Sequence, residues 1–519
     1  MAVPPQDPPL HALASWARDR YGLRWPLRAE VLKFIRSYQE RTGEPRPFVG
    51  RAALLQQLDE WLLQTKERLL LLSGAAGRGK SALLLHWLGR LIQREPHITL
   101  FYLPISIRFN TADETSGVEL LFAALCDVFS DLKERLPQQP ETQDYIQGIA
   151  SAWDQMALRD GQAFLLVVDG LDEAINQWFL NRHLLPRKLP PNLHLLISAR
   201  HKPGHTSGMA WLEDLVSNAR THERNVLEIR TLEKEAIAEA VTQLGHPLDR
   251  LAERQAFIDN LYRLTDDGDP LLLTLWLARI WRQRDALPDL DPKALACLGP
   301  GFGEFYKLWM KEQQSLWDAM GVDLHPGNIG QVMHVLAVAQ GPMPLADLID
   351  VLGHLNRPAR WEHKELSAVL ETAHRLVLGD ATGYVLVHPR LAHYFQEELE
   401  ADPVKGDAIR AAFLKWGAST VLRLNSGDLV PEACPVYLLT HYVAVHLSAG
   451  EAQGPQAFAE YHVPLLRQGW PRAWYAREGA WHGYLNDLKQ LVRRLQAFNA
   501  DCLRARCCRS FKYPCQAPS

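Results

Sequence analysis

The sequence has no long apolar run, no excess of one charge and no cysteine framework, and each absence excludes a class of protein. Its longest apolar stretch without Asp, Glu, Lys or Arg, residues 435–450, contains two histidines and a proline. It is shorter than the roughly 20 residues that a helix needs to cross a bilayer. Residues 1–9 carry no basic cluster ahead of an apolar segment, which disfavours a secretory signal. We therefore expect a cytoplasmic protein with no membrane partner.

The charges are nearly balanced, since 56 Lys and Arg residues face 60 Asp and Glu residues and the net charge is −4. Such a chain has no general basic field for holding nucleic acid, so nucleic acid is not an expected partner. Hydrophobic residues make up 47% and charged residues 22% of the 519 residues, the composition of a folded globular protein. This length predicts about three or four domains.

The seven cysteines form no recognisable framework. Three are scattered, and four lie near the end of the sequence, at Cys502, Cys507, Cys508 and Cys515. An odd and scattered set favours a reducing compartment over a disulfide scaffold. The lack of CxxC pairs also disfavours a zinc site in the tail.

Strand-like and helix-like patterns alternate in the first half of the chain. A helical pattern at 26–46 ends in a Gly and Pro linker, and short apolar runs follow at 69–72, 99–107, 163–168 and 193–197. Helical patterns between these runs predict a parallel sheet with helices on both faces. Beyond Leu232 helical patterns dominate, apart from one alternating strand at 383–388. Helical domains are therefore expected to follow the α/β domain.

The first apolar run leads into a glycine-rich loop with the pattern G-x-x-x-x-G-K-S. Its glycines let backbone N–H groups approach phosphate oxygens, and the next helix directs its positive end at the same anion. Lys80 is predicted to reach the β- and γ-phosphates, and Ser81 to bind Mg²⁺. A chance glycine-rich turn is the alternative. The predicted nucleotide-binding residues of this segment are Gly74, Ala75, Ala76, Gly77, Arg78, Gly79, Lys80, Ser81 and Ala82.

Two later strand ends carry charged side chains at the same predicted edge of the sheet. Asp169 ends one buried run and can hold Mg²⁺. Asp172 and Glu173 follow it, and they either orient and deprotonate an attacking water or are solvated loop acids. Arg200 ends the next run, where it either stabilises phosphate charge or lies on the surface.

Together these motifs resemble the NACHT branch of the STAND NTPases, which are signalling relatives of the AAA+ ATPases. The resemblance rests on the stretch Asp-Gly-Leu-Asp-Glu at 169–173, with a small residue after the Mg²⁺ aspartate and an acid three positions later. It implies that Asp169 binds Mg²⁺ and that Asp172 is the catalytic base, with Glu173 in support. It also implies that Arg200 is the sensor arginine.

A match near the start of the α/β domain extends the resemblance. Phe-Val-Gly-Arg at 48–51 is similar to the family's opening motif, whose backbone packs on the adenine. The resemblance therefore implies that Val49 and Gly50 contact the base. The sequence departs from the family pattern at Leu54, where a glutamate is usual.

Two matches in the later part of the chain complete the resemblance. Gly-Asp-Pro at 268–270 is similar to the GxP motif, which implies that Pro270 packs on the base, although Asp269 replaces a usual apolar residue. Pro270 also suits the first turn of any helix. Residues 332–395 resemble a winged-helix domain, which implies that His388 touches the β-phosphate of ADP. The alternative for His388 is a residue that caps the following helix.

We predict six parts along the chain, and the resemblance covers those between about residues 46 and 395. The six parts are an N-terminal helical lead-in and linker at 1–45, a P-loop NTPase domain at 46–230, a helical domain at 231–320, a winged-helix domain at 321–400, a helical arm at 401–500 and an irregular tail rich in Cys and basic residues at 501–519. We expect neither an effector domain before Pro26 nor repeats after residue 495.

The function implied by the resemblance is that of a regulatory switch. Its cofactors are ATP or ADP and Mg²⁺. ADP holds the domains closed, exchange for ATP opens them and permits self-association, and slow hydrolysis resets the state. The trigger is an unidentified protein or ligand. A catalytically weak scaffold that keeps ADP as a structural cofactor is the alternative, and the long helical regions disfavour a small-molecule kinase.

Overall fold

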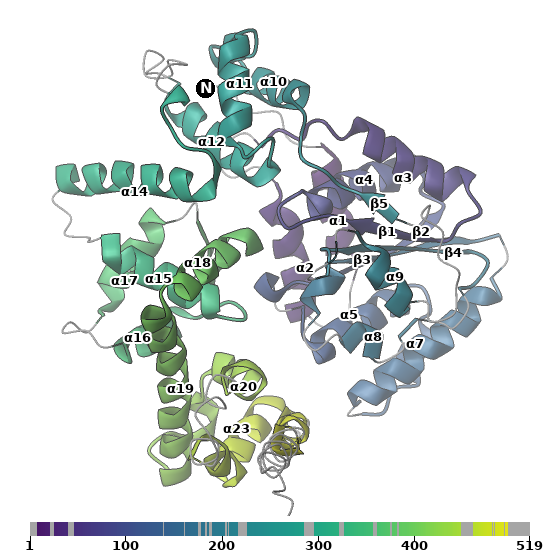
Figure 1. Cartoon of the computed structure of the whole chain (residues 1–519). Coiled ribbons are helices and arrows are strands. Elements are labelled where there is room, and N and C mark those ends of the chain that lie inside the picture. Colours follow the sequence, from purple (N-terminus) through teal and green to yellow (C-terminus); the bar gives the residue numbers. More distant parts are fainter. Residues whose placement is uncertain are drawn as a thin grey trace, which may run out of the picture. The chain divides into compact units, whose positions relative to one another are not determined.

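Figure 1 shows a computed structural model of the chain, which falls into two units. The first unit runs from the N-terminus to Asp323 and includes the segment His388–Arg390, and the remainder forms the second unit. The structure describes residues 8–496 apart from 21–24, 40–45, 110, 139, 160, 175–177, 182–183, 186–188, 203–204, 206, 216–225, 285–294, 321–325, 356–360, 374–375, 381–382, 448–459, 480, 482 and 493. The predicted tail at 501–519, with its four cysteines, lies outside these residues.

The first unit is built on a parallel sheet of five strands in the order β2-β3-β4-β1-β5. The strands are β1 (Leu69–Ser73), β2 (Ile98–Pro104), β3 (Ala163–Asp169), β4 (Leu193–Ala199) and β5 (Val226–Glu228). Continuous apolar runs form the first four because both faces of a parallel sheet are buried. The predicted α/β fold class is confirmed. The short β5, which is only partly buried, was not expected from the sequence.

Helices cover both faces of this sheet, as predicted. Figure 1 shows α3 (Ala52–Gln64) and α4 (Lys80–Arg94) on one face and α5 (Glu114–Cys126) and α7 (Thr142–Ala157) on the other. Leucines and a tryptophan on the inner side of α4 are almost completely buried. The shorter helices of this domain are α6 (Asp131–Glu134), α8 (Trp178–Asn181) and α9 (Met209–Leu215).

Two N-terminal helices, α1 (Pro8–Arg18) and α2 (Trp25–Ser37), belong to the same unit. The close approach of α1 to α4 depends on Gly89, since a Cβ built there would lie only 2.1 Å from the carbonyl oxygen of Pro9. The sequence predicted a helical lead-in and linker at 1–45 with a helical pattern at 26–46; α2 falls largely within that pattern, and α1 lies before it. The N-terminal segment therefore packs directly on the helix that follows the glycine-rich loop.

The rest of the first unit is helical. Its helices are α10 (Lys234–Gln243), α11 (Gln255–Leu264), α12 (Pro270–Arg282) and α14 (Gly301–Met320). The sequence defines the start of α12. Asp269 is the N-cap, and its Oδ1 accepts the N–H of Leu272 over 3.0 Å. Pro270 occupies the first turn, where a proline is favourable. A helical region after the sheet was predicted.

The described residues of the second unit form helices and the hairpin of two short strands. Its elements are α15 (Pro326–Val338), α16 (Leu345–Gly353), α17 (His363–Thr372), β6 (Val377–Asp380), β7 (Gly383–Leu386), α18 (Pro389–Ala401), α19 (Pro403–Ser426), α20 (Val436–His441), a π-helix (Tyr442–His446) and α23 (Gly469–Glu478). Strands β6 and β7 pair antiparallel, and only β7 was anticipated. The winged-helix interpretation and the domain boundaries stay predictions.

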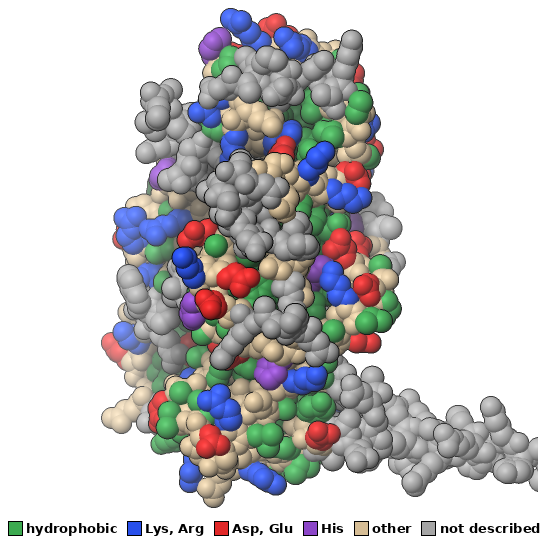
Figure 2. Space-filling model, turned by 90° about the vertical axis from the view of Figure 1, so that its left-hand side faces the viewer, with side chains coloured by type: hydrophobic (Ala, Val, Ile, Leu, Met, Phe, Trp, Pro, Cys, Tyr) green, Lys and Arg blue, Asp and Glu red, His purple; other side chains and the backbone are tan. Residues whose placement is uncertain are grey.

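Surface character agrees with the balanced composition. Figure 2 shows basic and acidic side chains interspersed over the face that it draws. Among the helices that the structure describes, none combines the length and the apolar character that crossing a bilayer requires.

Candidate phosphate-binding site

The register of the sheet brings the predicted motifs to one edge. Asp169, at the end of β3, stands opposite Ser198 of β4, and Ser73, at the end of β1, stands opposite Ala199. The segments that follow these strands therefore share the carboxyl edge of the sheet, where α/β proteins bind ligands. These segments are the glycine-rich loop at 74–81, the acidic stretch at 169–173 and Arg200.

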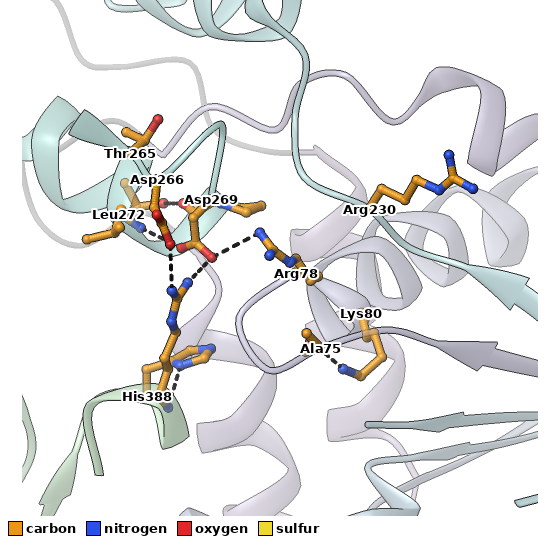
Figure 3. Close-up of polar contacts among 12 residues, drawn as sticks. Ala75, Arg78, Lys80, Arg230, Thr265, Asp266, Asp269, Leu272 and His388 are labelled. Carbon is orange, nitrogen blue, oxygen red and sulfur yellow. Dashed lines mark hydrogen bonds and ion pairs between the residues drawn. The ribbon is translucent and has the colours of Figure 1, made fainter. Parts of the chain in front are cut away.

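The glycine-rich loop adopts a conformation that its glycines permit. Gly77 and Gly79 have φ values of +81° and +89°, and α4 starts immediately afterwards at Lys80. Lys80 Nζ donates to the carbonyl oxygens of Gly74 and Ala75 over 2.8 Å and 3.0 Å, and burial lowers its pKa (Figure 3). The ammonium group thus lies inside the loop, beside the helix N-terminus.

Asp169 is buried and accepts hydrogen bonds from hydroxyl groups of three elements. Ser81 Oγ and Ser198 Oγ donate to its Oδ1 over 3.1 Å and 2.5 Å, and the Tyr102 hydroxyl donates to its Oδ2 over 3.0 Å. Burial raises the pKa of the Asp169 carboxyl, and these hydroxyl bonds oppose that effect. The Ser81 hydroxyl and the Asp169 carboxylate together present the oxygen ligands that Mg²⁺ prefers.

The residue after Asp169 must be glycine for two physical reasons. Gly170 has a φ of +92°, and a Cβ built on it would lie 2.5 Å from the carbonyl oxygen of Ile105. Its N–H donates to Ser198 Oγ over 2.9 Å. The small residue in the family pattern is therefore explained by the close approach of the backbone after β2.

The two acids that follow have different partners. Asp172 Oδ1 accepts the backbone N–H of Arg200 over 2.8 Å, and its Oδ2 forms a close ion pair with Arg200 Nε. Glu173 Oε2 accepts the N–H of Ile107 over 2.9 Å, and burial together with the charge of Asp172 raises the pKa of Glu173. Asp172 therefore holds the predicted sensor arginine, while Glu173 holds the backbone at Ile107.

A second ion cluster joins the glycine-rich loop to the start of α12. Asp269 Oδ2 pairs with Arg78 Nη1 over 3.4 Å and with Arg390 Nη1 at closer range (Figure 3). Arg390 Nη2 also lies 3.4 Å from Asp266 Oδ2. Burial raises the pKa of Asp269, and Arg390 is the largest opposing influence. The acid that departs from the family pattern thus holds two arginines, one of them in the glycine-rich loop.

His388 lies against the glycine-rich loop and also caps α18. Its Nδ1 accepts the N–H of Arg390 over 3.0 Å. A Cβ built on Gly77 would lie 3.6 Å from His388 Cε1. Burial, followed by the charges of four nearby cations, lowers the pKa of His388 well below its usual value. Because Nδ1 accepts, the neutral ring carries its proton on Nε2.

The Phe-Val-Gly-Arg motif at 48–51 contacts the glycine-rich loop through Arg51. Arg51 is buried, and its Nη2 donates to the carbonyl oxygens of Arg78 and Arg230 over 3.0 Å and 2.9 Å. Burial lowers the pKa of Arg51 to about 10. Gly50 has a φ of +65°, and Val49 is buried beside it. This conformation fixes the backbone at 49–51 next to the loop.

Sequence reasoning missed several side chains at this edge. Ser198 and Tyr102 bind Asp169 directly. Arg108 lies in the short 3-10 helix after β2 (Ile107–Phe109), and Tyr38 follows α2. Burial raises the pKa of the Tyr38 phenol, and the charge of Arg108 opposes that effect. Arg108 could have been found by the argument used for Arg200, since both follow strand ends. Nothing in the sequence points to Tyr38.

The residues present fit a nucleotide with Mg²⁺. The left-handed glycines leave room beside backbone N–H groups, Lys80 supplies a cation, and Ser81 with Asp169 supplies a hydroxyl and a carboxylate. Within the part of the chain that the structure describes, no group of three or more His, Cys, Asp or Glu side chains could hold a metal. The hydroxyl of Ser81 and the carboxylate of Asp169 suit a hard cation such as Mg²⁺, whose remaining ligands include phosphate oxygens.

Comparison with known proteins finds a family match within the first unit. Residues 68–246 match the NACHT domain family, which confirms the resemblance predicted from the motifs. Over 179 residues the chain is 27% identical to telomerase protein component 1 of Rattus norvegicus. That alignment covers 32% of this chain and only 6% of the length of the relative.

The solved structures with some likeness to this chain include the following three. A STAND protein with a tetratricopeptide repeat sensor from Pyrococcus horikoshii is 14% identical, with a TM-score of 0.38 over 89% of this chain and 65% of that chain. A Walker-type ATPase of Pyrococcus abyssi is 13% identical, with a TM-score of 0.32 over 69% and 99%. The Orc1 protein of Aeropyrum pernix in complex with DNA is 12% identical, with a TM-score of 0.33 over 69% and 94%.

Proposed function

Because residues 68–246 belong to the NACHT domain family, we propose that this chain is a nucleotide-dependent signalling switch. In this proposal it binds ATP or ADP with Mg²⁺ and hydrolyses ATP slowly, and the nucleotide sets domain opening and self-association. The observation that carries the proposal is the position of His388 beside Gly77, because it brings a residue from near the hairpin to the phosphate loop.

Each residue near the loop has a distinct role in binding. Lys80 and the backbone N–H groups of the loop bind the phosphates, Ser81 and Asp169 hold Mg²⁺, and Val49, Gly50 and Pro270 form the base side. Mg²⁺ supplies charge neutralisation of the phosphate oxygens. The base contacts of Val49, Gly50 and Pro270 rest on the family resemblance alone.

Each of the four cations near the glycine-rich loop already pairs with an acceptor of the protein, and a bound nucleotide can break these pairs. Lys80 is held by backbone carbonyls, Arg200 by Asp172, and Arg78 together with Arg390 by Asp269. A phosphate group competes with these acceptors for the same cations. A ligand shifts a conformational equilibrium only through its difference in affinity for the two states. Competition between phosphate and these acceptors can produce such a difference in nucleotide affinity between the two states.

Hydrolysis needs a base close to the γ-phosphate side of the site. We assign this role to Asp172, which becomes available when a γ-phosphate draws Arg200 away from it. Glu173 supports the site by holding the backbone at Ile107. The alternative remains a weakly catalytic scaffold that retains ADP, and it uses the same binding residues without the switch.

Substitution of His388 separates the switch from the scaffold. In the closed state the His388 Nε2–H donates to the β-phosphate of ADP, and a hydrogen bond to a charged group contributes about 1.5–3 kcal/mol. Its loss should raise the open fraction roughly 10- to 150-fold. His388→Ala is therefore expected to weaken ADP more than ATP and to increase self-association. Calorimetry with both nucleotides and light scattering on the same samples measure these effects.

A matched variant controls for the capping role of His388. Serine is a good N-cap residue but is too short to reach a phosphate, so His388→Ser keeps the start of α18 and removes the proposed contact. It should behave like His388→Ala in ADP affinity. Equal losses for ADP and ATP, or full recovery in His388→Ser, would leave His388 as a capping residue and favour the scaffold.

A further inference from the structure

A turn with unusual backbone geometry precedes α12 and carries two carboxylates toward the glycine-rich loop. Asp266 and Asp267 both have φ values of +54°, in the left-handed region that residues other than glycine rarely adopt, and Gly268 follows at +87°. The N–H of Asp269 donates to the carbonyl oxygen of Thr265 over 2.7 Å, which closes the turn. Backbone strain of this kind persists where the surrounding structure enforces it, and it clusters at functional sites. It therefore points to a function for the side chains of this turn.

Backbone contacts fix the position of the turn. A Cβ built on Gly268 would lie only 1.9 Å from the carbonyl oxygen of Leu232, and the N–H of Leu232 donates to the carbonyl oxygen of Gly268 over 2.8 Å. At the end of the turn Asp269 caps α12, so its Oδ1 is already taken by the N–H of Leu272. Only Oδ2 of Asp269 is left for cations.

Two arginines share that remaining oxygen. Asp269 Oδ2 pairs with Arg78 Nη1 over 3.4 Å and closely with Arg390 Nη1 (Figure 3). Arg390 Nη2 also lies 3.4 Å from Asp266 Oδ2. These four residues form an ion cluster within the first unit, which includes 388–390. The Asp269 side chain is fully buried, and because two cations lie so close it carries a buried negative charge that they neutralise.

The ion cluster meets the glycine-rich loop at Gly77. A Cβ built on Gly77 would lie 3.7 Å from Asp269 Oδ2 and 3.4 Å from Arg390 Cδ. Arg78 is the next residue of the loop. In the proposed function this loop binds the phosphates. The ion cluster therefore places a carboxylate, together with two arginines that it already occupies, beside the phosphate-binding backbone.

A buried anion at this place distinguishes phosphate ligands by their charge. Coulomb repulsion grows with the charge of the ligand, and a nucleoside triphosphate carries about one more negative charge than a diphosphate. Arginines that pair with Asp269 are also not free to neutralise that additional charge. Drawing them away would leave the Asp269 carboxylate buried without a partner, which is costly. The triphosphate is thus disfavoured for as long as the ion cluster is intact.

We propose that Asp269 is a specificity-determining residue: it occupies Arg390 and Arg78 in place of a γ-phosphate, so that the site with an intact ion cluster prefers a nucleoside diphosphate to a triphosphate. This inference rests on the proposed function and names a charge that sets which nucleotide the closed state retains. It also gives a physical role to the departure from the GxP pattern, because the usual apolar residue at this position carries no charge.

Asp269→Asn tests the inference, because asparagine keeps an oxygen for the capping bond with Leu272 and removes the charge. Affinities for ADP and for a non-hydrolysable ATP analogue are measured by calorimetry in Mg²⁺. A unit charge about 10 Å away changes the affinity for one further ligand charge roughly 2- to 20-fold, for effective dielectric constants between about 80 and 20. We expect Asp269→Asn to lower the preference for ADP over the ATP analogue by that factor.

The two neighbouring acids of the turn supply matched variants. Asp266→Asn removes an exposed partner of Arg390 and should shift the preference in the same direction but by less. Asp267→Asn makes the same chemical change at a residue that takes no part in the ion cluster, so its preference should equal that of the wild type. Asparagine tolerates the left-handed backbone at both positions. Asp266→Asn also keeps the inference testable if the buried substitution prevents folding.

A double variant tests the part that Arg390 plays. In Arg390→Gln protein the substitution Asp269→Asn frees one arginine fewer, so it should shift the preference less than it does in the wild type. The backbone N–H of residue 390, which His388 Nδ1 accepts, is retained in this background.

Three results overturn the inference. They are an unchanged preference in both Asp269→Asn and Asp266→Asn, an equal shift in Asp267→Asn, and a full shift by Asp269→Asn when Arg390 is already glutamine. If the wild type binds both nucleotides, these results leave the proposed function standing. If the wild type binds neither nucleotide, the proposed function fails and this inference fails with it.

Discussion

Lys80→Ala is expected to abolish measurable nucleotide binding. The Lys80 ammonium lies inside the glycine-rich loop, where it donates to the carbonyl oxygens of Gly74 and Ala75. It is the compact cation that a phosphate meets beside the N-terminus of α4. Loss of one or two hydrogen bonds to a charged group corresponds to roughly 10- to 10⁴-fold in affinity.

Calorimetry with ADP and ATP measures this effect directly. Lys66→Ala removes an exposed lysine and is the matched control for loss of one positive charge. Its affinities should equal those of the wild type. Similar melting temperatures for both variants and wild type would show that folding is not the cause. Unchanged nucleotide affinity in Lys80→Ala contradicts the assignment of the phosphate loop.

Asp172→Asn is expected to retain ATP binding and to slow hydrolysis roughly 10²- to 10⁴-fold, the usual contribution of a positioned base. Glu173→Gln should have a smaller effect, because the glutamine retains an oxygen that can accept the N–H of Ile107. Single-turnover hydrolysis with saturating ATP separates this effect from binding. A slower reaction in Glu173→Gln than in Asp172→Asn would reverse the assigned roles.

The Arg200→Ala variant tests whether Asp172 acts as the catalytic base or only holds Arg200 in place. If Asp172 acts only by holding Arg200 through the observed ion pair, the double variant Arg200→Ala/Asp172→Asn should hydrolyse ATP as slowly as Arg200→Ala alone. If Asp172 is the base, Asp172→Asn should slow the Arg200→Ala protein further. No change in turnover in any of these variants would favour the scaffold.

The sheet and its phosphate edge could be predicted because the sequence encodes them locally. Four continuous apolar runs became four strands, and the residues that end them lie at one edge by virtue of parallel pairing. Strand β5 has only three residues and is partly exposed, so it carries no comparable signal. Helix α1 begins at two prolines, which a sequence pattern assigns to an irregular segment.

The contacts that tune the site could not be predicted, because they join residues far apart in the chain. Asp269 and Arg390 are 121 positions apart, and Tyr102 and Asp169 are 67 positions apart. For His388 the sequence left a helix cap and a phosphate contact as alternatives. The capping bond is present and uses Nδ1, while Nε2 keeps the proton. The two roles use different nitrogens, so they are compatible.

The central claim is that the bound nucleotide sets the state of the molecule. It is tested most directly by light scattering on wild-type chain loaded with Mg²⁺ and either ADP or a non-hydrolysable ATP analogue, with the bound nucleotide identified by mass spectrometry. The account predicts a monomer that retains ADP and a larger assembly with the ATP analogue. The same mass in both samples, with each nucleotide shown to be bound, would contradict the switch.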